Sequence, residues 1–427
     1  MLRSAYSFSR KTEPYSEERC GRAFLGRITP ARSKLETFVD LPMKITDITT
    51  YLVGNPWKNW VFVRIDTDEG IHGIGEGSLG HLSKTVETAI HEMKPFILGL
   101  EIFQTETLVT RLLRHVYADG GQIKMCAISA VEIACWDAIG KALGQPIYNL
   151  VGGRVHERIP AYVNGWYRCP RTPDAFAKAA KHVVAGGYFG LKFDPFGSAM
   201  TRLNPPDEDL AIALVAAVRE AVGPHVLLAI EAHSRFSPST AVRIGKRLEP
   251  YSPAWFEEPV PHQNLAAMAE VAQRLEIPIA TGESLSSKQQ VAELLQHTAV
   301  DIINIEPLHM GGILGSRKVA DMVDAHYGTV IPHAAQGPIC TLACLHIDIS
   351  TPNSWLQETF EDFNEPWERR LLTKFPRIID GYFELPEGPG IGADLNLDEI
   401  KRHPYHENPD VSLFEDDWQF RRSEVSS

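Results

Sequence analysis

Three stretches of the chain decide the fold, and each is a short apolar run that ends near a glutamate. They are VLLAIEAHSRF at residues 226–236, AWFEEPV at residues 254–260 and IPIATGES at residues 277–284. Successive glutamates of the set Glu231, Glu257 and Glu283 are each 26 positions apart. Because this spacing fits one strand plus one helix, the stretches predict successive strand–helix units of one sheet.

The same alternation continues on both sides of these stretches. The expected strands are residues 159–163, 190–193, 226–230, 254–256, 277–280, 301–305, 329–332 and 354–356. The expected helices are residues 173–185, 207–222, 240–248, 265–275, 287–297, 314–325 and 338–349. Strict alternation predicts a parallel α/β sheet, and eight strands with seven helices predict a modified TIM barrel of the (β/α)7β type over residues 158–392.

The chain before and after the barrel has a different pattern. Residues 43–157 open with alternating strands and continue with helical patterns, which predicts an α+β domain. Its expected helices are residues 81–95, 103–116 and 126–143. Residues 1–42 are rich in Arg and Ser and lack periodicity, so we expect a disordered leader there. We expect the final segment, residues 393–427, to pack back on the α+β domain.

The composition is that of an ordinary globular protein. Hydrophobic residues make up 44% of the 427 residues and charged residues 22%, which allows a substantial core. The formal net charge of −12 argues against nucleic-acid binding. The chain lacks an apolar run of about 18 residues, which argues against a membrane helix. The six cysteines form no CxxC pair, so we expect reduced thiols in a cytoplasmic protein.

Ionisable side chains follow seven consecutive expected strands. In barrels of this kind the chemistry lies at the C-terminal ends of the strands. A single carboxylate there is usually a solvated loop residue or a helix cap, but seven ends in succession are hard to explain in that way. In chain order the side chains are Lys192 and Asp194, Glu231 and His233, Glu257, Glu283, Glu306, His333 and Glu358.

The three evenly spaced glutamates predict a metal site. Carboxylates on adjacent strand ends converge on one point, where they repel one another unless a cation lies between them. An all-oxygen set of ligands favours Mg²⁺ or Mn²⁺ over zinc. We therefore expect Glu231, Glu257 and Glu283 to bind Mg²⁺, with coordination positions left for water and a substrate carboxylate.

The remaining strand-end groups predict acid–base chemistry. Glu306 would orient His333 and raise its basicity, which makes His333 a candidate base, although a lone barrel histidine is more often packed or capping. Lys192 would hold a substrate carboxylate or act as a base with a lowered pKa, and the alternative is a surface lysine. Trp166 is a candidate wall of the substrate pocket, and burial in the core is the alternative.

The segment GEGSLG at residues 75–80 matches the G-x-G-x-x-G pattern of dinucleotide sites. That interpretation needs a βαβ unit and an acidic residue at the end of the second strand. A hairpin pattern precedes this segment instead, and a second helical pattern follows. We therefore expect a mobile loop of the α+β domain that closes over the substrate.

Taken together, these residues and motifs resemble the enolase superfamily. The chain is similar in particular to the mandelate racemase/muconate lactonizing enzyme-like members, and among them to the galactonate- and gluconate-type sugar-acid dehydratases. The resemblance covers residues 43–410. The matching motifs are DTDEGIHGIGEG at 66–77, WDxxGK at 136–141, GLKFDP at 190–195, EAHSRF at 231–236, WFEEPV at 255–260, ATGES at 280–284, Gly311-Gly312, PHAAQGPI at 332–339, NSWLQE at 353–358 and LPEGPGIGADLN at 385–396.

The resemblance implies a capping domain at residues 43–157 and Mg²⁺ held by the three glutamates. A Lys or His base acting with Mg²⁺ on an ene-diolate is already known for this superfamily. The resemblance therefore implies that the dyad of His333 and Glu306 is the base, and that Glu358 forms hydrogen bonds near the substrate carboxylate. In the superfamily Asp is usual at the positions of Glu231 and Glu306, so the exact geometry of these two glutamates is open.

His233 indicates the subgroup. Racemases and cycloisomerases of the superfamily usually have Asn at this position, whereas the dehydratases have His, often followed by x-Arg, as in His233-Ser234-Arg235. The resemblance implies that this His protonates the departing hydroxyl. Asp194 stands where racemases often have a second lysine, which also favours dehydration. The predicted substrate contacts are Lys192, Asp194, Arg235, Glu358 and Trp166.

We therefore expect a carbon–oxygen lyase that dehydrates a sugar acid to a 2-keto-3-deoxy acid by removing the C2 proton and the 3-hydroxyl. Galactonate, gluconate and arabinonate all fit this expectation. An epimerase, racemase or cycloisomerase using the same enolate is the first alternative, and a catalytically silent barrel is the second. Since members of the family are often oligomers, the resemblance also implies a homo-oligomer.

Overall fold

A computed structural model of the chain describes residues 42–55, 57–296, 300–360, 364–407 and 413–415. The expected leader lies outside these residues except for Pro42. All the described helices and strands belong to one compact unit, Met43–Ser427. Within the described residues, no helix is both long enough and apolar enough to cross a membrane.

The first part of this unit is an antiparallel sheet covered by helices, as the hairpin pattern predicts. Its elements are β1 (Ile45–Val53), β2 (Trp60–Thr67), β3 (His72–Glu76), η1 (Gly80–Leu82), α1 (Ser83–Ile97), α2 (Thr105–His115), α3 (Gly121–Leu143) and α4 (Ile147–Leu150). The three strands pair in the order β1-β2-β3. Helix α3 packs closely on β3. A Cβ atom at Gly75 would lie only 2.0 Å from the carbonyl oxygen of Ala130, so the contact needs glycine at this position.

This packing corrects the expectation of a mobile loop at residues 75–80. Gly75 and Glu76 belong to strand β3, and Glu76 and Ser78 are fully buried. Gly75, the first glycine of the G-x-G-x-x-G match, therefore allows the close contact between β3 and α3. Only the end of the segment leaves the sheet, and it runs into the short helix η1.

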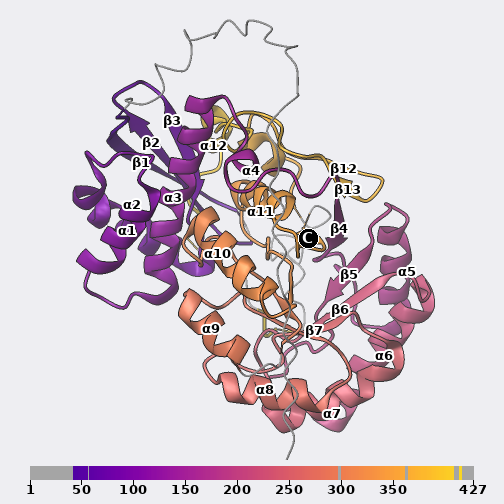
Figure 1. Ribbon diagram of the computed structural model, residues 1–427. Coiled ribbons are helices and arrows are strands. Elements are labelled where there is room, and N and C mark those ends of the chain that lie inside the picture. The colour runs from indigo at the N-terminus through magenta and orange to yellow at the C-terminus, as the bar shows by residue number, and fades with distance from the viewer. Residues whose placement is uncertain (1–41, 56, 297–299, 361–363, 408–412, 416–427) are drawn as a thin grey trace, which may run out of the picture. The chain divides into compact units, whose positions relative to one another are not determined.

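The second part is the expected ring of strands with helices outside it, which Figure 1 shows. The strands are β4 (Ile159–Val163), β5 (Gly190–Phe193), β6 (Leu227–Glu231), β7 (Trp255–Glu257), β8 (Ile279–Thr281), β9 (Ile302–Ile303), β10 (Thr329–Val330) and β11 (Gln357–Thr359). The helices are α5 (Pro173–Val184), α6 (Pro205–Val222), α7 (Pro238–Leu248), η2 (Glu249–Tyr251), α8 (Leu265–Arg274), α9 (Lys288–Gln296), α10 (Gly312–Asp324) and α11 (Pro338–Ser350).

The eight barrel strands are all parallel to their neighbours. Strands β4 to β10 pair in chain order, and β11 pairs with β4. A parallel bridge between Val330 and Ser354 joins β10 to the segment that enters β11. The order of the strands therefore closes on itself, as in a (β/α)7β barrel. The last strand begins three residues later than the expected strand 354–356, so Glu358 lies inside β11.

Short polar caps determine where several outer helices begin. The side chains of Thr172, Asn204, Ser237 and Asn264 each accept a backbone N–H at the start of α5, α6, α7 or α8. In the first three helices a proline follows the cap directly, and this position needs no N–H donor. These signals in the sequence explain why the expected helix boundaries agree with the structure to within a few residues.

The inside of the barrel is filled by one inward-facing side chain from almost every strand. This cluster consists of Tyr162, Ala229, Trp255, Ala280, Ile302, Ile331 and Leu356. Because side chains alternate along a strand, the next inward-facing positions on β6 and β7 are Glu231 and Glu257. The apolar layer therefore closes the barrel beneath the carboxylates.

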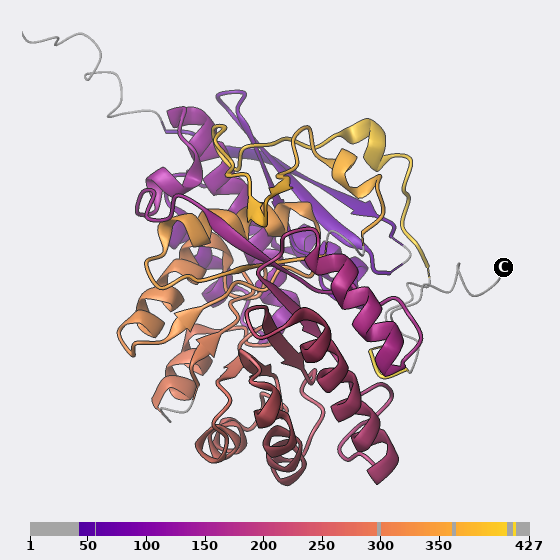
Figure 2. The same cartoon turned by 90° about the vertical axis from the view of Figure 1, so that its right-hand side faces the viewer.

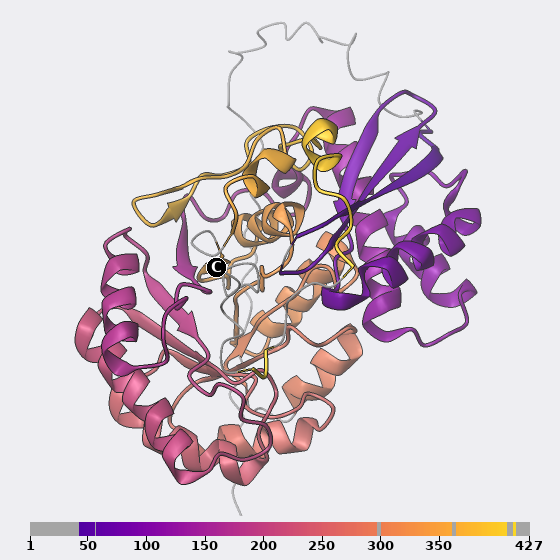
Figure 3. The ribbon, with the colours of Figure 1, turned by 180° about the vertical axis from the view of Figure 1, so that it is seen from behind.

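The chain after the barrel returns to both parts of the unit. Its elements are η3 (Glu368–Leu371), β12 (Ile378–Ile379), β13 (Tyr382–Phe383) and α12 (Leu397–Ile400). Strand β13 pairs antiparallel with β4, which extends the sheet beyond the expected strands. Further on, Asp394 pairs with His72 at 2.6 Å, and the carbonyl of His403 accepts from the N–H of Gly54 at 2.9 Å. Figures 2 and 3 show this yellow segment beside the β1-β2-β3 sheet.

Candidate active site

The ends of β6, β7 and β8 bring the three evenly spaced glutamates together. One carboxylate oxygen from each of Glu231, Glu257 and Glu283 lies within 4.8 Å of the others. The first two side chains are buried, and that of Glu283 is 18% exposed. Among the described residues, Oε2 of Glu231 accepts no hydrogen bond although it is buried. The ammonium of Lys192 lies 3.4 Å away, so this buried oxygen has a charged neighbour but no hydrogen bond, and a bound cation would complete the arrangement.

The electrostatics of the triad also indicate a cation site. Burial and the charge of Glu231 raise the pKa of Glu257 well above its usual range. Burial also acts to raise the pKa of Glu231, but the charges of His233 and Lys192 outweigh it and lower that pKa to about 2. The carboxylates therefore compete for the little positive charge nearby. An all-oxygen site of this kind fits Mg²⁺.

Lys192 supplies that positive charge from β5. Its Nζ lies 2.7 Å from Oε1 of Glu257, 2.9 Å from Oε1 of Glu358 and 3.4 Å from Oε2 of Glu231. Burial acts to lower the pKa of Lys192, but the charges of Glu257 and Glu358 outweigh it and raise the pKa well above its usual value. The ammonium group therefore keeps its proton and pairs with protein carboxylates, and its expected contact with a substrate carboxylate stays a prediction.

The structure brings His333 and Glu306 together beside the triad. The Nδ1 atom of His333 lies 2.8 Å from Oε2 of Glu306, and its Nε2 lies 3.1 Å from Oε2 of Glu283. The backbone N–H of His333 donates to the carbonyl of Ile305, which carries the parallel pairing beyond the ends of β9 and β10. Burial acts to lower the pKa of His333, but Glu283 and the bond to Glu306 outweigh it and raise the pKa to about 9.

His233 lies on a sharp turn that follows β6. Its φ is +47° and that of Ser234 is +57°, so two successive non-glycine residues adopt the left-handed conformation. Nδ1 of His233 lies 2.7 Å from Oδ2 of Asp194. In the closed strand order, β6 and β10 are four strands apart. His233 and His333 therefore approach the triad from opposite sides of the eight-stranded ring.

Two of the predicted substrate contacts, Arg235 and Asp194, are bonded to each other within the protein. Arg235 donates to Asp194 through Nη2 and also to the carbonyls of Ala232, Gly197 and Ala199. Its side chain and that of Asp194 are fully buried. The contacts favour a role for both in positioning His233, and the predicted substrate role stays untested.

Trp166 lies in the aromatic core beside the barrel. Its indole N–H donates to the carbonyl of Lys192 at 2.9 Å, and its ring packs against Tyr167, Phe176 and Phe193. The side chain is only 6% exposed. These contacts favour the core interpretation of Trp166 over the pocket wall.

Sequence reasoning missed three groups near the site. Asn164, directly after β4, donates to Oε1 of Glu358, and the strand-end rule would have found it if amides had been counted. Glu258 accepts hydrogen bonds from Ser234, Thr281 and the N–H of Gly282. In the sequence it stands directly after Glu257, which was the residue chosen from that strand end. His309 binds the carbonyl of Glu283 through Nδ1. Nothing in the sequence distinguishes His309 from a loop histidine.

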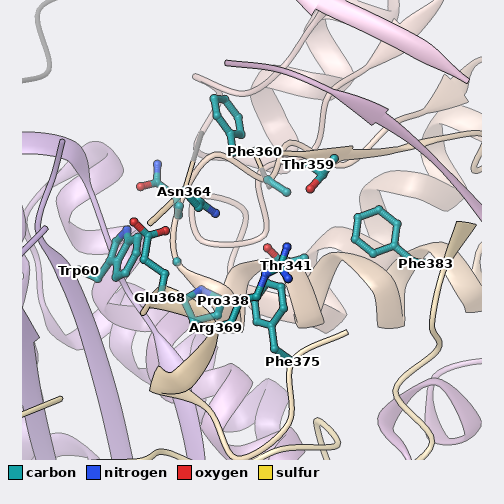
Figure 4. A pocket seen from close by; sticks show the side chains of 13 residues that line it. Trp60, Pro338, Thr341, Thr359, Phe360, Asn364, Glu368, Arg369, Phe375 and Phe383 are labelled. Carbon is teal, nitrogen blue, oxygen red and sulfur yellow. The ribbon is translucent and has the colours of Figure 1, made fainter. Parts of the chain in front are cut away.

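A small pocket adjoins the site behind the ends of β10 and β11. Its wall includes Ala334 and Thr359, which follow His333 and Glu358 directly in the chain. Figure 4 shows Trp60, Glu368 and Phe360 around it. The three glutamates do not line this pocket, so the pocket adjoins His333 and Glu358 and lies outside the glutamate cluster.

A parallel barrel with three convergent carboxylates and two flanking histidines defines a class of sites that can bind a cation and transfer protons. The model of the mandelate racemase/muconate lactonizing enzyme N-terminal domain matches residues 39–152, and the enolase C-terminal domain-like model matches residues 175–400. The chain belongs to the mandelate racemase/muconate lactonizing enzyme family of the enolase superfamily.

Known proteins of similar sequence include several dehydratases. A D-gluconate/D-galactonate dehydratase of Picrophilus torridus is 33% identical over 81% of this chain and 89% of its own length. A D-xylonate dehydratase of Haloferax volcanii is 34% identical over 84% of this chain and 89% of its own. The crystal structure of a mandelate racemase/muconate lactonizing enzyme from Jannaschia sp. CCS1 matches with a TM-score of 0.81, 31% identity, and coverage of 86% of this chain and 98% of that one.

Proposed function

We propose that the chain is a Mg²⁺-dependent hydro-lyase that converts an aldonate to a 2-keto-3-deoxy acid. One observation carries the proposal. Two histidines, each bonded through Nδ1 to its own carboxylate, face the glutamate triad from opposite sides of the barrel. β-Elimination needs one base and one acid at neighbouring carbons, and this pair supplies both. The names of the relatives, which are dehydratases of gluconate, galactonate and xylonate, support the same class of substrate.

Glu231, Glu257 and Glu283 would hold the Mg²⁺ ion. Bound there, the ion would polarise the substrate carboxylate and stabilise the negative charge that forms when the C2 proton leaves. Two properties support this assignment. Oε2 of Glu231 is buried and accepts no hydrogen bond, and the pKa of Glu257 is raised.

His333 would remove the C2 proton. Its Nδ1 is held by Glu306, so its Nε2 is the atom that faces the reacting carbon, and Nε2 points toward Glu283 and Glu358. A carboxylate on Nδ1 fixes the tautomer and stabilises the imidazolium that results. Glu358 would form hydrogen bonds near the substrate carboxylate.

His233 would donate a proton to the 3-hydroxyl, which leaves as water. The bond between C3 and oxygen breaks as the double bond between C2 and C3 forms, and the enol then ketonises to the 2-keto-3-deoxy acid. Because His233 and His333 approach from opposite sides, the geometry supports removal of the proton and the hydroxyl from opposite faces of the substrate.

The decisive experiment separates the two proton transfers. The purified protein is incubated with Mg²⁺ and a panel of aldonic and aldaric acids in D₂O, and 2-keto-3-deoxy products are trapped. We expect His233→Asn to exchange the C2 proton without elimination, and His333→Asn to do neither. No turnover by the wild type across the panel, or full elimination by His233→Asn, would refute the proposal.

A further inference from the structure

The described residues between β1 and β2 contact residues that follow β11 in the chain. Nδ2 of Asn55 donates to Oε1 of Glu368 at 2.6 Å, and Oδ1 of Asn55 accepts from the N–H of Trp57 at 2.8 Å. The ring of Trp57 packs on that of Phe360, which follows β11, with centroids 5.4 Å apart. These contacts join the described residues of the loop to η3 and to the residue that follows β11, the strand that contains Glu358.

The same loop carries a lysine that is buried without an ion pair. Lys58 is 6% exposed, and its Nζ lies over the ring of Trp57, 4.1 Å from the centroid. Within the part of the chain that the structure describes, Lys58 forms no hydrogen bond or salt bridge. Two other lysines that are buried or half-buried differ, because Lys192 pairs with three carboxylates and Lys141 pairs with Asp137.

The surroundings of Lys58 place its charge on the side of the base. Burial lowers the pKa of Lys58 to about 8, and the charges of Glu306, Glu76 and Glu358 act in the opposite direction. A lysine with this pKa remains largely protonated at neutral pH. Lys58 is therefore a buried cation on which the charges of Glu306 and Glu358, the carboxylates beside His333, act.

An anionic substrate needs such a cation. Five glutamates surround the site, and the ammonium of Lys192 is already shared among three of them. The five are Glu231, Glu257, Glu283, Glu306 and Glu358. Even with the divalent ion that the triad would hold, the five negative charges exceed the combined positive charge of the ion and Lys192, so a further cation would favour the entry of a carboxylate. Lys58 is buried and forms no ion pair with a described residue, so its ammonium group can supply this charge.

We propose that Lys58 of the capping loop binds a carboxylate group of the substrate and positions it against the barrel. Lys58 would act as a positioning residue, since proton transfer is assigned to the two histidines. The proposal rests on the proposed function only for the class of substrate, a sugar acid. It requires a loop that lies beside the end of β11, and the contacts of Asn55 and Trp57 place it there.

Direct binding to acids that cannot react tests the proposal. The 3-deoxy derivatives of gluconate, galactonate and xylonate lack the leaving hydroxyl, so their binding to the Mg²⁺-loaded protein can be measured by calorimetry. Losing a hydrogen bond to a charged group corresponds to about 10- to 100-fold weaker binding. We expect this loss in Lys58→Met, with most of the binding retained in Lys58→Arg. With true substrates, KM should rise more than kcat falls.

Controls separate this role from a structural one. Lys84→Met removes a capping-domain charge on the exposed side of α1 and should bind like the wild type. Thermal unfolding of Lys58→Met should match or exceed that of the wild type, because the variant removes a buried charge. Equal binding by Lys58→Met and the wild type, or absence of binding of every acid to the wild type, would overturn the proposal.

A comparison of acids identifies which carboxylate is bound. If Lys58→Met loses binding equally for an aldonate and for the aldarate of the same configuration, Lys58 holds the carboxylate next to C2. A larger loss for the aldarate places the far carboxylate on Lys58. Both results support the proposal. The two proposals can fail separately. If the wild type dehydrates none of the acids but Lys58→Met still loses acid binding, only dehydration is refuted. If the wild type dehydrates an acid and Lys58→Met binds it as tightly, only the role of Lys58 is refuted.

Discussion

His233 and Asp194 are joined by a contact of 2.7 Å between Nδ1 of the imidazole and Oδ2 of the carboxylate. The same Oδ2 accepts from Arg235, which also binds three backbone carbonyls. Asp194 lies just after β5 and His233 just after β6, so the contact joins two adjacent strand ends. It fixes the orientation of the ring and stabilises its protonated form.

Asp194→Asn should therefore slow elimination more than it slows proton exchange at C2. The amide keeps the shape but loses the charge that favours a protonated His233. Loss of such a supporting group costs about 10- to 100-fold in activity. The rates of 2-keto-3-deoxy product formation and of deuterium incorporation are measured side by side, with the exposed Asp174→Asn as control. Equal slowing of both reactions would contradict the assignment of Asp194 to His233.

Glu258 should influence metal affinity without being a ligand. Its carboxylate binds Ser234 after β6, and Thr281 and Gly282 at the end of β8, so it holds the loops that carry Glu231 and Glu283. Supporting groups of this kind contribute about 10- to 100-fold to metal affinity. We expect Glu258→Gln to weaken Mg²⁺ binding by that factor in a calorimetric titration. The exposed Glu270→Gln is the control, and unchanged affinity in Glu258→Gln would argue against this role.

The charges around Glu257 predict how stability depends on Mg²⁺ in the wild type and in a Glu257 variant. Mg²⁺ at about 100 times its Kd should stabilise the wild type by about 2.7 kcal/mol, and a chelator should reverse this. Glu257→Gln should lose that stabilisation, because the neutral amide removes one of the three carboxylates; without metal its stability should change little, since the variant removes both the repulsion of Glu231 and the ion pair with Lys192. Thermal unfolding with and without Mg²⁺ measures both, with Glu293→Gln as control. A wild type that does not respond to Mg²⁺ would count against the metal site.

The parts of the fold and site that the sequence predicted share one property. They follow from periodic patterns and from the rule that the ends of parallel strands meet, and this is how Glu231, Glu257 and Glu283 could be placed together. Contacts between segments far apart in the chain have no such signal. The pattern shows where the strand before Asp194 ends, and a contact with substrate was therefore expected. The pattern does not show that Arg235 and His233 bind the carboxylate of Asp194. Lys58 lies in an irregular loop, where no periodicity points to burial.

The buried glutamates of the capping domain illustrate the same limit. Glu132 on α3 accepts the N–H groups of Ile313 and Leu314 at the start of α10, the helix that follows the strand of Glu306. A Cβ atom at Gly312 would lie 1.9 Å from Oε2 of Glu132, so only glycine allows this approach. Nothing in the helical pattern of α3 distinguishes Glu132 from a solvated charge.

Glu132 also predicts how stability depends on pH. Burial raises the pKa of Glu132 from 4.5 to about 7 in the folded protein. Between these values the folded state keeps a proton that the unfolded chain releases, so the free energy of unfolding contributed by this group falls as the pH rises and levels off above about pH 8. The advantage of the wild type over Glu132→Gln should thus shrink by about 1 to 3 kcal/mol between about pH 5 and pH 8. Denaturant unfolding measures it, with the exposed Glu92→Gln as control, and a difference that grows with pH would show that Glu132 is ionised when buried.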